Sequence, residues 1–150
     1  MPYSADAAFI QEQWQNEYFP RENTLTLNTG FYCLFDLPHQ HPRLINKVWM
    51  PALDYPRQDE PGFVMPLGFS ADGPQPFYAT GGETAAFGGD GFLSLQEKDS
   101  DTLIWLIVLS ETNPFNRVDI QGQYLCAEST SGVRVRVPIE RPDQLTLTWP

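Results

Sequence analysis

The sequence predicts a mainly β fold, an antiparallel sheet or β-sandwich with one N-terminal α-helix packed on it. Two observations carry this prediction. From residue 91 to residue 148, apolar or alternating runs are separated by short polar turns, which is the pattern of an antiparallel meander. In the first twenty residues the apolar positions instead follow helical spacing. No internal repeat or linker divides the 150 residues, so we expect a single domain over 1–150.

The helix is expected between Ser4, as its N-cap, and Pro20, which would end it. Asp6 suits the positive end of the helix dipole. One apolar stripe follows steps of three and four residues and is expected to pack against the sheet through Ala7, Ile10, Trp14 and Tyr18.

The middle of the chain changes to strand patterns broken by proline. Residues 24–28 alternate and residues 31–35 are continuously apolar, so both read as strands. Prolines make 36–62 irregular, with one short strand or helical turn at 44–49. Pro66 marks the run 62–69 as an edge or bulged strand.

Residues 70–91 are dense in glycine and proline, which predicts an exposed, mobile loop with at most a short strand at 77–79. The glycines do not predict a phosphate site, because no lysine and no clear helix follow them. A calcium loop would need more acidic residues than Glu83 and Asp90.

The last sixty residues are the clearest. The run 103–109 is wholly apolar and rich in β-branched residues, which predicts a buried central strand. Asn113-Pro114-Phe115 matches a short peptide motif that some trafficking domains recognise. Because it directly follows the buried strand, we interpret it as a turn whose Phe115 fills the core.

The charge balance narrows the choice of partners. Nine basic and 19 acidic side chains give a net charge of −10, which repels nucleic acid and anionic membrane surfaces. The charge favours a basic protein partner, or serves solubility alone. The N-terminus lacks the pattern of a signal peptide and the longest apolar run is too short to cross a bilayer, so we expect a cytoplasmic protein.

The cysteines and histidines predict neither a cofactor nor a metal. Cys33 and Cys126 lie in apolar strand-like runs and are expected to be buried, reduced thiols. His39 and His41 lie in a proline-flanked loop with Asp36 as the one further ligand nearby, too few for zinc. Without a nucleophile–base pair or a G-x-S-x-G elbow, the sequence predicts a protein that is not an enzyme.

Four acidic residues are the candidate partner-binding residues. Glu97, Asp99 and Asp101 alternate in a charged turn that could be a solvated hairpin tip or an acidic contact for a basic protein. Asp90, in the glycine-rich segment, is taken as an equally exposed candidate.

The run TLIWLIVLSETNPFNRV at 102–118 and the closing PIERPDQLTL at 138–147 resemble bacterial polymorphic-toxin immunity proteins. The resemblance implies a small antitoxin that neutralises a toxin domain by direct contact, and it transfers no site residue. Two alternatives remain open. One is a β-sandwich that binds a small ligand or carbohydrate in an aromatic-lined groove formed by Trp49, Tyr55, Phe77 and Tyr78. The other is a structural subunit of a larger assembly.

Overall fold

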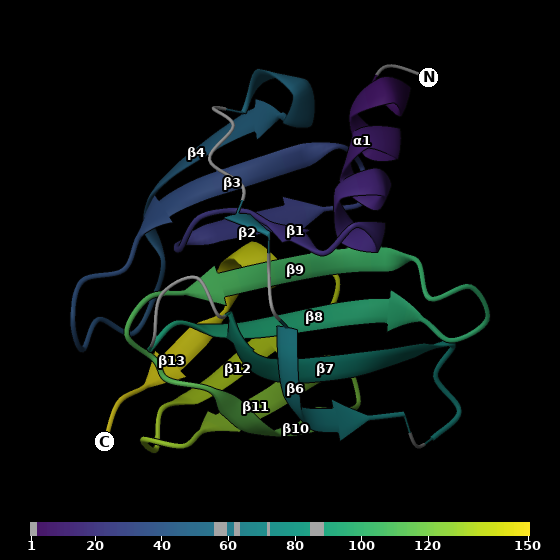
Figure 1. Cartoon of the computed structure of the whole chain (residues 1–150). Helices are drawn as coiled ribbons and strands as arrows, with labels where there is room; N and C mark the ends of the chain where they lie inside the picture. Colours follow the sequence, from purple (N-terminus) through teal and green to yellow (C-terminus); the bar gives the residue numbers. More distant parts are fainter. Residues whose placement is uncertain (1–2, 56–59, 62–63, 72, 85–88) are drawn as a thin grey trace.

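Two antiparallel sheets packed face to face form the molecule, and one helix covers the outer face of the larger sheet (Figure 1). The computed structural model describes residues 3–55, 60–61, 64–71, 73–84 and 89–150. It confirms the predicted mainly β fold with an N-terminal helix, α1, at Ser4–Gln15. Two short 3-10 helices, η1 and η2, lie at Ala52–Asp54 and Pro142–Gln144.

The larger sheet has seven strands in the order β4-β3-β2-β9-β8-β7-β6, and every neighbouring pair is antiparallel. As predicted, the apolar run at 103–109 lies inside the sheet, as β9 between β2 and β8. The strand bounds are Thr24–Leu27 (β2), Phe31–Asp36 (β3), Ile45–Pro51 (β4), Val64–Ser70 (β6), Phe77–Thr84 (β7), Gly91–Glu97 (β8) and Leu103–Leu109 (β9).

The smaller sheet is the predicted C-terminal meander, in the order β10-β11-β12-β13. A separate two-residue ladder joins β1 (Tyr18–Phe19) to β5 (Glu60–Pro61). The meander strands are Phe115–Gln121 (β10), Tyr124–Ser129 (β11), Arg134–Pro138 (β12) and Thr146–Thr148 (β13).

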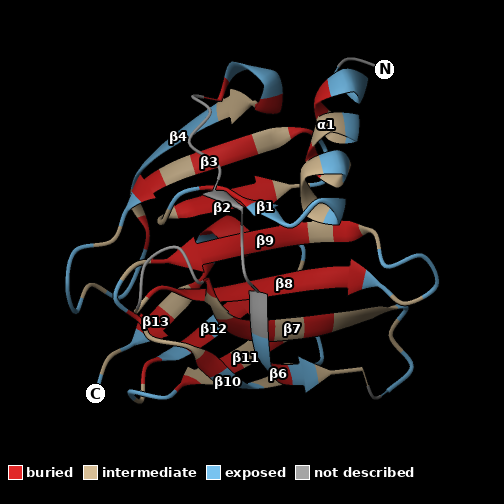
Figure 2. Ribbon diagram, viewed as in Figure 1, coloured by how far each residue is buried: buried red, intermediate tan, exposed pale blue. Residues whose placement is uncertain are grey.

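The main core fills the space between the two sheets, where buried residues concentrate (Figure 2). Strict alternation places Leu125 and Val135 inward, while their strand neighbours point outward. Trp105 from β9 is 1% exposed, and its indole N–H donates a 3.1 Å hydrogen bond to the carbonyl oxygen of Ile139. Phe115 is fully buried, as the interpretation of its motif as a turn requires.

A second core lies on the opposite face of the large sheet, under α1. Ile10 of the predicted stripe is buried here, and Trp14 packs half-buried against the same cluster. This face explains why β9 has no polar alternation: Trp105 and Ile107 face the smaller sheet, while Leu106 and Val108 face the helix side.

The predicted helix ends are wrong. Ser4 is the first helical residue and makes no capping hydrogen bond, while Tyr3 occupies the N-cap position with φ 66°. Asp6 lies in the first turn of the helix, as predicted, and also accepts a 2.9 Å hydrogen bond from the backbone N–H of Leu53. The helix ends at Gln15, before Pro20, so Tyr18 of the predicted stripe lies in β1 and is exposed. No helix in the described ranges is long and apolar enough to cross a membrane.

The expected loop at 70–91 is largely strand. β7 runs for eight residues through Gly81 and Gly82 and pairs with β6 on one side and β8 on the other. A Cβ placed on Gly81 would lie 2.6 Å from Cγ2 of Val118 and 3.0 Å from Cβ of Phe115. The glycine therefore serves close packing of β7 against β10. Residues 72 and 85–88 of the expected loop lie outside the described residues.

The two proline-rich runs became the edges of the large sheet. β6 is an edge strand with a register shift between Pro66 and Gly68, as predicted for a bulged strand. β4 is the other edge, so the short element expected at 44–49 is a strand. Prolines at both edges limit pairing with another chain.

Candidate functional site

The turn between β8 and β9 brings three of the four predicted acidic residues together. Glu97 is the last residue of β8, and Asp99 and Asp101 follow within the turn; all three are exposed. A 2.9 Å hydrogen bond from the Asp101 N–H to the Glu97 carbonyl oxygen closes the turn. The predicted charged hairpin tip is confirmed, and we call residues 97–101 the acidic turn.

Hydrogen bonds hold the carboxylates of the acidic turn in place. Glu97 Oε2 accepts 3.1 Å hydrogen bonds from the hydroxyls of Ser100 and Thr102. The Tyr78 hydroxyl donates a 2.8 Å hydrogen bond to Asp101 Oδ1. Burial, with help from this carboxylate, raises the pKa of Tyr78 to about 12, so the phenol stays a hydrogen-bond donor well into the alkaline range. The turn therefore presents preorganised negative charge.

Asp90, the fourth candidate, is not exposed as expected. It is 8% exposed and lies just before β8, at the end of that strand remote from Glu97, about 20 Å away along the strand. Its Oδ1 accepts a 3.2 Å hydrogen bond from the backbone N–H of Glu111. Asp90 thus fixes the connection after β9 and is separated from the acidic turn.

We expect Asp90→Asn to stabilise the protein at neutral pH. Burial raises the pKa of Asp90; the hydrogen bond from the Glu111 N–H opposes this rise, and the charges of Glu22 and Glu111 add to it. A folded-state pKa above the unfolded value means that ionisation costs stability, and the cost appears as pH rises through the folded-state pKa. Asn keeps an oxygen for the Glu111 amide and carries no charge.

Urea melts check this expectation. The unfolding midpoint of Asp90→Asn should exceed that of wild type near pH 7, and the difference should vanish by about pH 3, where the native carboxyl is also protonated. Asp119→Asn, at an exposed carboxylate, is the control and should show no such gain. A lower midpoint for Asp90→Asn at pH 7 would mean that the charge itself stabilises the connection.

A pocket of about 440 Å³ adjoins the acidic turn, and we call it the turn pocket. Close to this pocket, α1 lies beside the start of β9 (Figure 1), and the side-chain amide of Gln11 exchanges hydrogen bonds of 2.8 and 3.0 Å with the Leu103 backbone. The lining residues come from the end of α1, from the turn after it, from β1, from β6 to β8 and from the acidic turn: Trp14, Gln15, Glu17, Phe19, Pro66, Thr80, Phe92, Gln96, Ser100 and Asp101.

The turn pocket combines aromatic rings with an unpaired polar atom. Trp14 stacks on Phe19 at 5.9 Å between ring centroids, and Phe19 meets the edge of Phe92 at 5.4 Å. Gln96 is 3% exposed and donates a 2.8 Å hydrogen bond to Ser94 Oγ. Its Oε1 has no partner among the described residues. An unpaired buried acceptor costs about 1–3 kcal/mol, so a donor entering here would relieve a cost.

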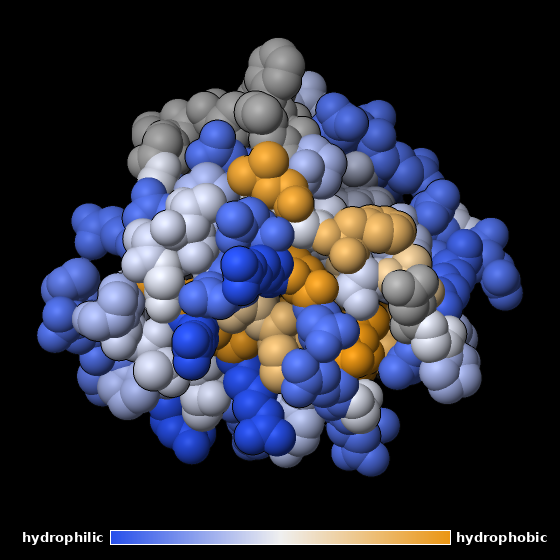
Figure 3. All heavy atoms as spheres, turned by 90° about the horizontal axis from the view of Figure 1, so that it is seen from below, coloured by the Kyte–Doolittle hydropathy of each residue, from blue (hydrophilic) through white to orange (hydrophobic). Residues whose placement is uncertain are grey.

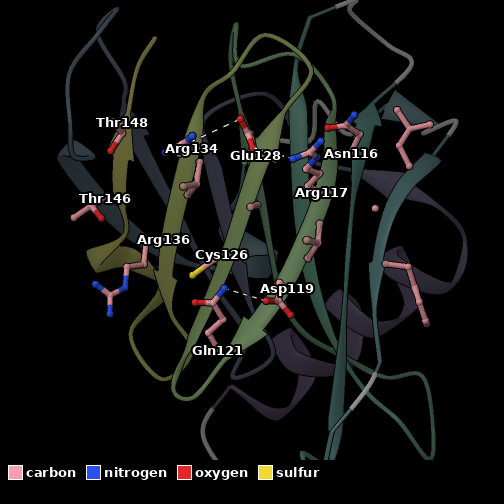
Figure 4. A pocket seen from close by; sticks show the side chains of 16 residues that line it. Asn116, Arg117, Asp119, Gln121, Cys126, Glu128, Arg134, Arg136, Thr146 and Thr148 are labelled. Atoms are coloured by element: carbon pink, nitrogen blue, oxygen red, sulfur yellow. Dashed lines mark hydrogen bonds and ion pairs between the residues drawn. The ribbon is translucent and has the colours of Figure 1, made fainter.

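A larger hollow, of about 850 Å³, lies on the outer face of the small sheet beside β6 (Figure 4). Here Arg117 and Arg134 each lie 3.8 Å from the Glu128 carboxylate. Arg136 stacks over the Tyr124 ring at 3.8 Å. We call this surface the arginine face. The underside of the molecule, where β6 and β10 lie, shows hydrophilic side chains around separate apolar patches (Figure 3).

Basic residues gather on the arginine face, away from the negative charge of the acidic turn. It holds three of the nine basic residues of the chain. Glu128 lies between two of these arginines, and the three cations outnumber the two carboxylates of this face, Glu128 and Asp119. A basic partner is therefore attracted to the acidic turn and gains less from this face.

The structure does not assemble the expected aromatic groove. Trp49 is on β4, at one edge of the large sheet, whereas Phe77 and Tyr78 are on β7, near the other edge. Tyr55 is 3% exposed and packs on Tyr32 in the second core. The aromatic pocket that does form uses Trp14, Phe19 and Phe92, which sequence reasoning assigned to packing or did not single out.

The thiols and imidazoles lie apart from the acidic turn. Cys33 and Cys126 are both free, one in the main core and one half-buried on the arginine face. Burial raises the pKa of Cys33 to about 11. His41 Nδ1 lies 2.8 Å from the Arg43 carbonyl oxygen, and His39 lies against Trp149. Within the described ranges, no three His, Cys, Asp or Glu residues are grouped as metal ligands.

Comparisons with protein-family models, with curated proteins and with solved structures find no match to this chain.

Proposed function

We propose that this chain is a non-enzymatic binding protein that neutralises a basic protein partner through the acidic turn. In its most concrete form it is an immunity protein that occludes a toxin domain. One observation carries the proposal: Glu97, Asp99 and Asp101 are exposed together, and hydrogen bonds hold two of these carboxylates in fixed positions. The resemblance of 102–118 and 138–147 to immunity proteins supports the choice of partner class.

Charge and rigidity together favour fast association with a basic surface. The net charge of −10 attracts a cationic protein over a distance of the order of the Debye length. Carboxylates that are already ordered lose little side-chain freedom on binding, so less of the interaction energy is spent on ordering. The acidic turn is therefore suited to steering a partner and to orienting it.

The partner itself is the first experimental target. The immobilised chain is used to capture proteins from a lysate of the source cells, and the captured protein is identified by mass spectrometry. We expect a basic protein that arrests growth when it is expressed alone, and we expect co-expression of this chain to restore growth. A captured protein that is acidic, or that has no effect on growth, would contradict the immunity proposal.

The association rate with that partner should depend on the acidic turn. We expect Glu97→Gln, Asp99→Asn and Asp101→Asn together to slow association about three- to tenfold at low salt, while dissociation changes less. Asn is chosen at position 101 because Asp101 has φ 58°, a region that Asn tolerates. Stopped-flow rates are measured from about 0.01 M to about 0.1 M salt, where the Debye length falls from about 30 Å to about 10 Å.

A second triple variant controls for net charge. Asp54, Asp119 and Glu140 are exposed carboxylates away from the acidic turn, and their conversion to Asn, Asn and Gln removes the same three charges. This variant should slow association clearly less than the variant of the acidic turn. Equal slowing by both variants would mean that total charge matters and that the turn is no contact. If the association rate of the wild-type chain does not change with salt concentration, association is not electrostatically steered and the proposed role of the acidic turn is contradicted.

The turn pocket favours a second candidate function, the binding of a small ligand. Its volume of about 440 Å³ lies within the usual range of ligand pockets, and three aromatic rings line it. The function is the same as that of the aromatic-lined groove considered from the sequence, but the binding residues are different: Trp14, Phe19 and Phe92.

A further inference from the structure

We propose that the turn pocket is the receptor for one arginine side chain of the partner. The inference rests on the proposed function, because it assumes a basic protein partner, and it names the group that this partner inserts. Three features of the pocket point to a guanidinium group with an apolar stem: its rings, its negative rim and its unpaired acceptor.

The aromatic rings offer a surface for both parts of an arginine side chain. Trp14 is half-buried and stacks on the buried Phe19, so one part of its ring system packs in the second core while another lines the pocket. Phe92 is fully buried and also lines the pocket. A planar guanidinium can stack on the half-buried ring of Trp14, and the methylene stem gains from the apolar contact.

The pocket rim carries negative charge from two separate elements. Glu17 follows α1 and is held with φ 59° by a 3.1 Å hydrogen bond from its N–H to the Trp14 carbonyl oxygen. Asp101 belongs to the acidic turn. Its Oδ1 accepts the hydrogen bond from Tyr78, and its second carboxylate oxygen, Oδ2, is left for a ligand. Two carboxylates at one pocket favour a cation, and arginine can bond to a carboxylate with two N–H groups.

The end of α1 adds to this field. The helix ends at Gln15, and both Trp14 and Gln15 line the pocket, so the negative end of the helix dipole lies at the site. The last turn of α1 contains no basic residue that would neutralise this end. The negative potential at the pocket thus has three origins: Glu17, Asp101 and the helix terminus.

Gln96 supplies the third feature. Its amide oxygen accepts no hydrogen bond from any described residue, although the side chain is almost wholly buried at the pocket. Rotation of the terminal amide toward the pocket would let this oxygen accept from a guanidinium N–H. Arginine carries five such donors, more than any other side chain, and has no acceptor that would be left unpaired.

The test uses Nα-acetyl-arginine amide as the probe, with Nα-acetyl-citrulline amide as its uncharged isostere. NMR titration follows the indole N–H resonance of Trp14, assigned against those of Trp49, Trp105 and Trp149. We expect a saturable shift with the arginine compound and at least about tenfold weaker binding of the citrulline compound. The affinity for arginine should fall as salt is added.

Matched variants place the binding in the pocket. Glu17→Gln and Asp101→Asn should each weaken arginine binding about threefold, and the double variant should weaken it about tenfold. Asp119→Asn, which removes one charge on the arginine face, should leave the binding unchanged. Circular dichroism of each variant verifies that the fold is intact.

Three outcomes would overturn the inference: no saturable shift at Trp14, equal binding of arginine and citrulline compounds, or equal weakening by Asp119→Asn. Equal binding would support the small-ligand function in its place. The two proposals fail separately. If the turn variant slows association with the partner but the pocket does not bind arginine, the proposed function still holds and the arginine site does not. If the pocket binds arginine but association with the partner does not depend on salt, the arginine site still holds and the proposed function does not.

Discussion

Phe115→Ala is expected to lower the free energy of unfolding by about 3–5 kcal/mol. Phe115 begins β10 and is fully buried in the core between the two sheets. A Cβ built on Gly91 would collide with its ring, and one built on Gly81 would lie 3.0 Å from its Cβ, which shows how closely β7 and β8 surround it. Truncation therefore leaves a cavity that these backbones cannot fill.

Urea denaturation measures this loss. Phe69→Ala is the control, since Phe69 is 65% exposed and its truncation should cost less than about 1 kcal/mol. The comparison also decides the reading of Asn113-Pro114-Phe115. A loss of less than about 1 kcal/mol for Phe115→Ala would show that the ring does not pack in the core. The tripeptide would then be accessible as a recognition motif.

Gly81→Ala is expected to destabilise the fold by about 1–3 kcal/mol through overpacking. The added methyl group would lie 2.6 Å from Cγ2 of Val118 and 3.0 Å from the Phe115 carbonyl oxygen. In an exposed flexible loop the same change would be neutral or slightly stabilising, because it restricts the unfolded chain. A loss of stability in Gly81→Ala therefore indicates a strand packed on β10, whereas no change or a gain indicates the loop that the composition suggests.

A double variant identifies the cause of the loss. Val118→Ala removes the methyl group nearest to the new Cβ, so Gly81→Ala should cost less in that background than in wild type. Additive losses would show that the two sites do not interact, and the close approach of β7 to β10 would then not be the cause.

Several elements could be predicted because their signals are local. The apolar run at 103–109 and the alternation at 124–129 and 134–138 predict strands, since successive side chains of a strand point to opposite faces. The acidic turn could be predicted for the same reason, because a charged run between two such strands must form the hairpin tip. The functions assigned to these elements stay predictions.

Other features depend on partners far away in the chain. Gly81 of β7 is explained by the approach of β10, some 35 residues later, and composition alone cannot distinguish that contact from loop flexibility. Asp90 is likewise buried and accepts its hydrogen bond from the backbone of Glu111, which lies 21 residues later, after the end of β9.

The sequence by itself thus determined the fold class, the order of the C-terminal strands and the acidic turn, because periodicity and charge act between near neighbours. Tertiary structure alone decided which polar residues are buried and where a pocket forms. The turn pocket joins the end of α1 to β7, β8 and the acidic turn, more than 60 residues apart in the chain. Helix and sheet meet through the packing of Ile10, Trp14 and Phe92. The spacing of apolar residues predicts which face of a helix is buried, but it does not predict which strands that face will contact.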